Sequence, residues 1–275
     1  MTKSEKTGYN DKYANDESRC FFKTRGLRNE RILHLKRLTV ALMAAVLLFL
    51  PLSGSAAEAR QYSQFFGFGS RDEARVAVTI DDWWEPGLIP DFLEVAAQYG
   101  VKLTLYPCGC NLHVEDQALW QSVLDAGHEI GSHGFSHQDF SERGSLLIAH
   151  DFVKFGNALD KVLGYHYEFL TVRVPYGGGW RQGGSGHLGR SCHDAGFDYV
   201  IFWDMDNTKD LKKALETIQN GSIILLHANR HDLKFFSELM EGLRDRGYEY
   251  VTVTELLNIS TRLIPDAQTN ADTGA

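Results

Sequence analysis

Five apolar runs in this sequence each lead into a residue that can bind a metal or transfer a proton. The runs VAVTI, HEIGS, FLTV, YVIFW and IILL are followed in turn by the pair Asp81 and Asp82, then His133, Arg173, Asp204 and His227. In proteins built from alternating strands and helices, side chains at the carboxyl ends of parallel strands gather on one face. We therefore expect residues from different strands to share one pocket. Its predicted members are Asp81, His133, Arg173, Asp206 and His227.

Two histidines bracket the segment HGFSH and indicate a metal site. His133 and His137 are four residues apart, a spacing that places both imidazoles on one side of a helical turn, where they can bind one cation. The same spacing also occurs in ordinary capped turns, so the pair alone is a weak signal. A carboxylate from Asp82 would complete a set of two histidines and one carboxylate with positions left for water. Such a set is typical of catalytic rather than structural metal sites.

The two adjacent acids at the end of the first apolar run can serve different purposes. Neighbouring residues of a strand point in different directions, so one carboxylate of Asp81 and Asp82 can reach a metal while the other faces the substrate. The alternative is structural, because carboxylates that follow a strand commonly cap the next turn.

The elements that must position these residues alternate along the chain. Predicted strands cover residues 76–80, 102–107, 129–132, 169–173, 198–203, 223–227 and 249–253. Predicted helices lie between them at 89–100, 116–127, 146–164, 190–195, 210–221 and 233–247, and several end at a glycine. Strands that alternate with helices in this way predict a parallel sheet joined by right-handed crossovers.

The predicted fold class is α/β, a distorted, incomplete (β/α) barrel with about seven strands. A complete eightfold barrel takes about 250 residues, more than this alternating region offers. An open doubly wound sheet is the alternative, and its ligand crevice would also lie at the carboxyl ends of the strands. We expect one domain over residues 60–260, followed by a polar tail over 261–275 that lacks periodicity and is predicted to be disordered.

Residues 1–57 carry the pattern of an export signal. Lys36 and Arg37 precede the uncharged run LTVALMAAVLLFL, and the small-residue stretch SGSAAEA follows. The run is shorter than the roughly 20 apolar residues that usually span a membrane. Either a cleaved signal or an uncleaved anchor through residues 38–52 fits this pattern. In both cases the basic pair favours a location of the remaining chain outside the cytoplasm.

Composition and charge narrow the class of partner. The 275 residues are 43% hydrophobic, which suits a globular chain with a sizeable core. The formal net charge is −8, and no dense Lys or Arg cluster follows Arg60, so nucleic acid is not an expected partner. The sequence carries no signal for an oligomeric state.

Three cysteines remain if the export signal is removed. One disulfide from Cys192 to either Cys108 or Cys110 would leave one free thiol. The spacing matches none of the usual paired zinc motifs, so a metal site built from these cysteines is not expected.

Five short motifs, taken together, resemble a known family. TIDD at 79–82, HGFSH at 133–137, RVPYG at 173–177, WDMD at 203–206 and IILLH at 223–227 resemble, in the same order, the motifs of the NodB-homology polysaccharide deacetylases, carbohydrate esterase family 4. The resemblance extends over about residues 74–258. It implies a distorted barrel and one divalent metal, usually zinc, in an enzyme that removes acetyl groups from amino sugars or sugar hydroxyls.

The resemblance implies acid–base roles for four residues. Asp81 would be the general base, and Arg173 would orient and ionise it. His227 would be the general acid, and Asp206 would hold His227 in its charged form.

The remaining matched residues would bind the metal and the substrate. The implied metal ligands are Asp82, His133 and His137. Contacts to the substrate and its oxyanion are assigned to Tyr176, Leu225 and Trp203.

The sequence departs from the family pattern at two of these motifs. Trp83 and Trp84 stand where many members have glycine and proline, and we expect them to reshape the rim above the base. The segment WDMDNTKDL lacks the tryptophan that usually closes the fourth motif, so the assignment between Asp204 and Asp206 stays open.

Three functions are compatible with these motifs. The favoured one is a metal-dependent deacetylase acting on an N-acetylated cell-wall or extracellular polysaccharide. An O-acetyl esterase acting on an acetylated glycan such as xylan is the second, and a non-catalytic relative that binds glycan is the third. Because a binding protein needs neither a general base nor a general acid, Asp81 and His227 favour an enzyme.

Overall fold

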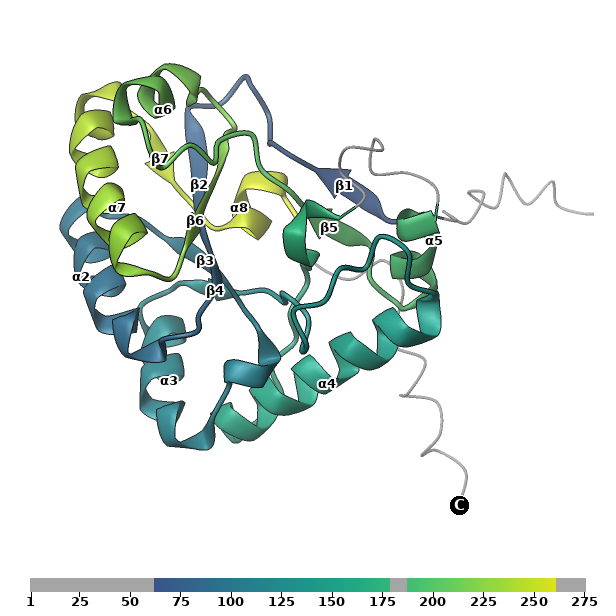
Figure 1. The fold of residues 1–275 in the computed structure, drawn as a ribbon. Helices are drawn as coiled ribbons and strands as arrows, with labels where there is room; N and C mark the ends of the chain where they lie inside the picture. Colours follow the sequence, from purple (N-terminus) through teal and green to yellow (C-terminus); the bar gives the residue numbers. More distant parts are fainter. Residues whose placement is uncertain (1–61, 179–186, 261–275) are drawn as a thin grey trace, which may run out of the picture. The chain divides into compact units, whose positions relative to one another are not determined.

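Strand β2 (Arg75–Asp82) lies in the middle of a five-stranded parallel sheet. In the computed structural model, which describes residues 62–178 and 187–260, β2 pairs with β3 (Leu103–Pro107) on one side and with β6 (Ile223–His227) on the other. Two short strands extend the sheet: β4 (Glu129–Ile130) pairs with β3, and β7 (Glu249–Tyr250) pairs with the start of β2. The carboxyl ends of β2, β3 and β6 therefore meet at one edge (Figure 1).

A second parallel sheet and several single-residue bridges complete the barrel. Strand β1 (Gln64–Phe66) pairs with β5 (Tyr199–Ile201). Val172 bridges both Ser132, just beyond β4, and β5, while Met205, beyond β5, bridges β6. The parallel strands thus follow one another around an interior, which confirms the predicted distorted barrel rather than the open sheet.

Two details of the strand prediction were wrong. The run 169–173 contributes only the bridging residue Val172 rather than a strand. Strand β1 was not predicted, because its three residues carry no long apolar run.

All the helices but the last lie between successive strands, largely where the sequence predicts them. They are α2 (Ile89–Tyr99), α3 (Gln117–Asp125), α4 (Ser145–Leu163), α5 (His187–Asp194), α6 (Leu211–Thr217), α7 (Arg230–Leu243) and α8 (Val253–Leu257). Short 3-10 helices cover Pro86–Leu88, Gly109–Asn111, Val114–Asp116, Pro175–Gly177 and Arg244–Arg246. Helix α2 contacts α3 and α7, α4 contacts α3 and α5, and α6 contacts α7, so these helices form a continuous outer layer (Figure 1).

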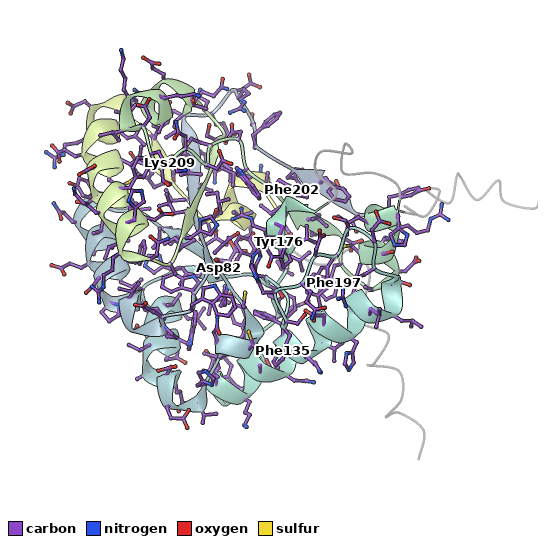
Figure 2. All side chains as sticks on the ribbon, viewed as in Figure 1. Asp82, Phe135, Tyr176, Phe197, Phe202 and Lys209 are labelled. Atoms are coloured by element: carbon purple, nitrogen blue, oxygen red, sulfur yellow. The ribbon has the colours of Figure 1, made fainter. Side chains whose placement is uncertain are left out.

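Side chains of β2 alternate between two cores. Val76, Val78 and Ile80 pack in the large apolar cluster that the helices share. Ala77 belongs instead to a smaller cluster with Tyr106, Ile223, Val253 and Leu256 inside the barrel. Because alternate residues of a strand share one face, Asp81 lies on the inner face, at the carboxyl end of the strand. Figure 2 draws the side chains that the sheet and the helices carry.

Several predictions concern the ends of the chain and its cysteines. The predicted signal or anchor in residues 1–57, including 38–52, and the tail 261–275 lie outside the described residues, so both stay predictions. No helix in the described part of the chain has the length and apolar character needed to cross a membrane. Cys108, Cys110 and Cys192 are all free, so the disulfide that the sequence allowed is not formed.

Candidate metal centre and active-site cavity

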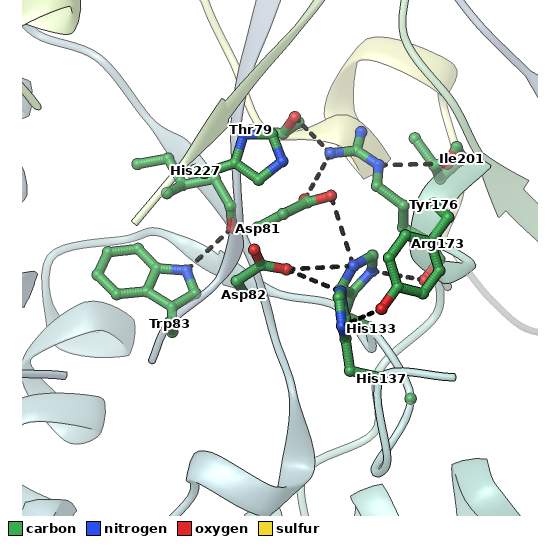
Figure 3. Close-up of polar contacts among 12 residues, drawn as sticks. Thr79, Asp81, Asp82, Trp83, His133, His137, Arg173, Tyr176, Ile201 and His227 are labelled. Carbon is green, nitrogen blue, oxygen red and sulfur yellow. Dashed lines mark hydrogen bonds and ion pairs between the residues drawn. The ribbon is translucent and has the colours of Figure 1, made fainter. Parts of the chain in front are cut away.

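The end of β2 sends its two acidic side chains in different directions. Asp82 and Trp83 have φ angles of 74° and 60°, a left-handed conformation that non-glycine residues adopt rarely. This turn leaves Asp81 buried on the inner face and aims Asp82 at the histidine loop (Figure 3). The indole of Trp83 is fully buried and donates a hydrogen bond to the carbonyl of Ile80 at 2.9 Å. Trp83 is therefore a core residue, and the prediction that it shapes the rim was wrong.

His133 and His137 lie in a loop rather than in the predicted helical turn. Helix α4 holds this loop through the buried carboxylate of Asp151, which accepts hydrogen bonds from the backbone N–H of Phe135 at 2.6 Å and from the hydroxyl of Ser136 at 2.5 Å. The loop is thus fixed by side-chain contacts, and its two imidazoles still meet, with ring centroids 5.2 Å apart.

Both imidazoles present the same nitrogen to Asp82. The Nε2 atoms of His137 and His133 lie 3.2 Å and 3.5 Å from Asp82 Oδ1 (Figure 3). His133 Nδ1 donates to the backbone carbonyl of Arg173 at 2.8 Å, and His137 Nδ1 lies 3.2 Å from the hydroxyl of Tyr176. A histidine whose Nδ1–H is bonded to a carbonyl presents an unprotonated Nε2, as metal-binding histidines do.

These donors fit a divalent cation. One donor atom from each of Asp82, His133, His137 and Cys108 lies within 4.8 Å of each of the others. Imidazole nitrogen and carboxylate oxygen are the usual ligands of catalytic zinc and related metals. Asp82, His133 and His137 therefore form a candidate metal site, at the positions that the resemblance implied.

Burial and neighbouring charges put two of these groups in the state that a metal requires. Burial alone would raise the pKa of Asp82, but the hydrogen bond from His137 and the nearby His133 outweigh it and lower the pKa below its ordinary value. Burial lowers the pKa of His133, although Asp81 and Asp82 oppose this effect. A charged carboxylate and a neutral imidazole are the forms that bind metals.

Arg173 anchors the carboxylate of Asp81 from inside the barrel. The guanidinium is fully buried, and its Nη1 donates to Asp81 Oδ1 at 2.8 Å and to the hydroxyl of Thr79 at 2.6 Å. Its Nε and Nη2 donate to the carbonyls of Ile201 and Phe202 at 3.3 Å and 3.2 Å. This many contacts fixes the guanidinium and, through it, the orientation of Asp81.

The partner of His227 is Asp232 rather than the predicted Asp206. His227 Nδ1 lies 3.5 Å from Asp232 Oδ2, which also accepts the backbone N–H of His227 at 2.8 Å. Asp232 is buried in the first turn of α7, where Asn229 caps the helix by accepting its N–H at 2.9 Å. This carboxylate raises the pKa of His227 above its ordinary value, against the opposing effect of burial, and Asp81 adds to the increase.

The structure also separates the two aspartates of the fourth motif. Asp204 accepts hydrogen bonds from Arg71 at 2.8 Å, from the hydroxyl of Ser222 at 3.0 Å and from the backbone N–H of Ile223 at 2.9 Å. It therefore ties the start of β6 to neighbouring segments. Asp206, in contrast, lines the cavity above the candidate metal site.

A cavity of about 330 Å³ brings the predicted residues together. It is lined by Asp81, Asp82, His133, His137, Val174, Tyr176, Gly177, Trp203, Asp206, Leu225 and His227. Arg173, the remaining predicted residue, lies behind Asp81 in the barrel interior.

Two exposed aromatic rings stand beside the metal site. Trp84 is 53% exposed and Tyr176 is 70% exposed, and their ring centroids lie 5.5 Å and 4.8 Å from that of His137. Trp84 alone therefore takes the rim position that the sequence predicted for both tryptophans.

Two residues near the site were missed or misjudged from the sequence. Asp232, which the Asn229 cap places beside His227, was not predicted as the partner of His227. Cys108 was set aside because the cysteine spacing matches no paired zinc motif. The signal that could have found it is its place directly after β3, since β3 and β2 pair with Pro107 opposite Asp82.

The parallel barrel is the fold that the resemblance to carbohydrate esterase family 4 implied, and a candidate metal site of one carboxylate and two histidines lies at its carboxyl edge. Residues 69–184 match the family model named polysaccharide deacetylase. The chain belongs to the polysaccharide deacetylase family.

Known proteins agree with this membership. The chain is 25% identical over 197 residues to the peptidoglycan-N-acetylglucosamine deacetylase PgdA of Listeria monocytogenes. The match covers 68% of this chain but only 40% of that protein. It is 27% identical over 199 residues to a peptidoglycan-N-acetylglucosamine deacetylase of Bacillus cereus. That match covers 68% of this chain and 89% of that protein.

A solved structure shows the same fold. The crystal structure of a carbohydrate esterase family 4 pseudoenzyme from Bacillus anthracis superposes with a TM-score of 0.61 at 21% identity. The match covers 70% of this chain and 68% of that one. At this identity the likeness speaks for the fold alone.

Proposed function

We propose that this chain is a metal-dependent hydrolase that removes acetyl groups from an N-acetylated cell-wall or extracellular polysaccharide. One observation carries the proposal: Asp81 and His227 line the same cavity as the cluster of Asp82, His133 and His137. A proton acceptor and a proton donor beside a metal site are what amide hydrolysis requires.

The three cluster residues would hold one divalent cation, and we propose zinc. Zinc commonly binds two histidines and one carboxylate in catalytic sites. When bound, such a cation supplies Lewis-acid polarisation of the acetyl carbonyl and makes water easier to ionise.

Asp81 would accept the proton of the attacking water. Its Oδ1 is bonded to Arg173, which fixes the carboxylate, while Oδ2 lies 3.9 Å from His133 Nε2 and so faces the cluster. A base that is already held in the right orientation needs little reorganisation when it accepts the proton. The backbone N–H of Tyr176, a residue that lines the cavity, would contribute to binding the oxyanion that develops on the acetyl oxygen.

His227 would donate a proton to the departing amine. An amine leaves readily only when it is protonated, so amide cleavage needs an acid, whereas an ester can depart more easily. The Asp232 carboxylate raises the pKa of His227 and so favours the protonated imidazole. This pairing supports an N-deacetylase over an O-acetyl esterase.

The rim supports a sugar substrate. Tyr176 lines the cavity, and the exposed ring of Trp84 lies beside His137, 5.5 Å away between ring centroids. Such rings offer apolar faces with a polar edge for an amphipathic ligand. The two bacterial relatives are named as peptidoglycan-N-acetylglucosamine deacetylases. We therefore propose an N-acetylated amino sugar of a bacterial cell-wall glycan as the substrate class.

Acetate release tests the proposal. The purified protein is incubated with a panel of acetylated glycans, namely peptidoglycan, chitin oligosaccharides and acetylated xylan, with and without a chelator. We expect acetate from an N-acetylated member and its loss with chelator. His227→Ala should lower turnover by about 10²–10⁴-fold while the metal content stays intact. Glycan binding without acetate release under any metal would instead identify a non-catalytic relative, like the pseudoenzyme of Bacillus anthracis.

A further inference from the structure

A buried cysteine lies against the candidate metal site. Cys108 directly follows β3, and its side chain is completely buried. Its Sγ lies within 4.8 Å of the donor atoms of Asp82, His133 and His137. A thiolate is one of the strongest zinc ligands in proteins, so a cysteine at this position affects which metal the site binds.

The backbone around Cys108 joins the two segments that carry the other ligands. The N–H of Cys108 donates to the carbonyl of Asp82 at 3.0 Å. The next two N–H groups, of Gly109 and Cys110, donate to the carbonyls of Gly134 and Phe135, in the histidine loop, at 2.9 Å and 3.0 Å. Cys108 is therefore held at a fixed place between the Asp82 turn and the histidines.

The distances allow a bond to the same cation. Sulfur and nitrogen donors bound to one zinc ion at a tetrahedral angle, at about 2.3 Å and about 2.0 Å, lie about 3.5 Å apart. The donors here lie within 4.8 Å of one another without an ion. A closure of up to about 1.3 Å, which small rotations of the four side chains can supply, brings all four donors into one coordination sphere.

We propose that the Cys108 thiolate is a fourth protein ligand of the cation held by Asp82, His133 and His137, and that it makes the site prefer Zn²⁺ or Co²⁺ over Mg²⁺ or Mn²⁺. Soft sulfur ligands select thiophilic metals, whereas an oxygen-rich set does not. When the sulfur–metal bond forms, the S–H bond breaks and its proton passes to the buffer, with no change of oxidation state. The inference rests on the proposed function, because it needs a metal at this site.

The fourth ligand leaves the cavity side of the site available. Cys108 does not belong to the lining of the cavity, which Asp81 and His227 share with the three other ligands. The sulfur thus approaches from the buried side of the cluster, and a position toward the cavity remains for water or an acetyl oxygen. Catalytic metal sites keep such an open position.

The two other described cysteines, Cys110 and Cys192, lie outside the donor cluster and provide controls. Cys192 is buried in α5 within the apolar core, and Cys110 lies next to the site but is partly exposed, with its Sγ 3.6 Å from Asn111 Oδ1. Neither belongs to the donor cluster. Cys110→Ser is therefore the matched control for Cys108→Ser, two residues away on the same loop.

Cobalt loading tests the inference without measuring activity. The full chain is loaded with one equivalent of Co²⁺, and its absorption spectrum is recorded. A thiolate ligand produces an intense near-ultraviolet sulfur-to-cobalt charge-transfer band in addition to the weak visible d–d bands. We expect this band in the wild type and in Cys110→Ser, and its loss in Cys108→Ser with the d–d bands retained. In competition experiments Cys108→Ser should lose affinity for Zn²⁺ more than for Mn²⁺.

Each outcome decides the inference. Cobalt that binds the wild type with d–d bands but without a charge-transfer band overturns the role of Cys108 and leaves the proposed function standing. Failure of the wild type to bind cobalt or zinc overturns both. If Cys108→Ser does not fold, X-ray absorption of the zinc-loaded wild type decides: one sulfur at about 2.3 Å supports the inference, and a shell of only nitrogen and oxygen at about 2.0–2.2 Å contradicts it.

Discussion

Two buried carboxylates lie at opposite ends of the barrel and are stabilised in different ways. At the carboxyl end of the strands, Asp81 is paired with the fully buried guanidinium of Arg173 at 2.8 Å. At the other end, Glu129 accepts hydrogen bonds only from neutral donors, namely the hydroxyl of Thr104 at 3.1 Å and the N–H and hydroxyl of Thr254, both at 3.2 Å.

The difference separates the carboxylate that we propose as the general base, Asp81, from a structural one, Glu129. Burial raises the pKa of Glu129 despite its hydrogen bonds, since no cation among the described residues is paired with it. Glu129 is hydrogen-bonded to Thr254 of helix α8, and neither Glu129 nor any residue of α8 lines the cavity. Asp81 instead opens to the cavity and keeps a buried cation behind it. The carboxylate that faces the cavity is thus paired with a buried guanidinium, whereas the carboxylate away from the cavity is bound only by neutral donors.

The largest expected effect comes from removing the guanidinium of Arg173. Arg173→Met leaves the buried Asp81 without its partner, so we expect a loss of about 3–5 kcal/mol in the free energy of unfolding, together with loss of acetate release. Denaturant unfolding measures the first effect. Arg190→Met, a change at an exposed arginine of α5, is the control and should have little effect. An Arg173→Met protein as stable as the wild type would show that the ion pair does not support the barrel.

A change at the partner of His227 should shift the pH dependence of activity. The raised pKa means that His227 stays protonated to higher pH, and the acid function is lost as the pH rises through this pKa. Asp232→Asn removes the charge that raises it, so the alkaline limb of the kcat/KM profile should move to lower pH. Asp206→Asn, also in the cavity, should not produce this shift. The opposite pattern would restore Asp206 as the partner that the sequence predicted.

The smallest effect is expected at the structural carboxylate. Because the pKa of Glu129 is raised in the folded chain, the folded state holds this proton more tightly than the unfolded state. The free energy of unfolding therefore falls as the pH rises from the ordinary glutamate pKa through the raised one. Glu129→Gln should remove this slope, change stability at neutral pH by no more than about 1 kcal/mol and leave activity unchanged.

Denaturant unfolding across a pH series checks this prediction. Glu216→Gln, at an exposed position of α6, is the control and should keep the slope. A large loss of stability in Glu129→Gln would mean that this carboxylate, like Asp81, is needed in its charged form.

The sequence predicted the parts of the site that depend on strand ends. Asp81, Asp82 and His227 follow long apolar runs, and parallel pairing sets Asp81 opposite His227 in the structure. The meeting of His133 with His137 was also expected, although the reason was different. A loop held by Asp151, rather than a helical turn, brings the two imidazoles together.

The sequence could not predict contacts that depend on tertiary packing. The pairing of Asp232 with His227 requires the angle at which α7 leaves β6, which no local pattern encodes. The burial of Trp83 depends on the left-handed turn at Asp82, a conformation that side chains normally avoid. Helix α8 was missed although its capping box, Thr252 with Glu255, is legible in the sequence TVTE.

The metal content of two neighbouring variants tests the central claim most directly. Asp82 points at both histidines, whereas Asp81 is bonded to Arg173. After purification and dialysis against zinc, elemental analysis should find about one zinc per chain in the wild type and in Asp81→Asn, and a large loss in Asp82→Ala. Equal zinc in Asp82→Ala and the wild type, or none in any of the three proteins, would contradict a cation held by Asp82, His133 and His137.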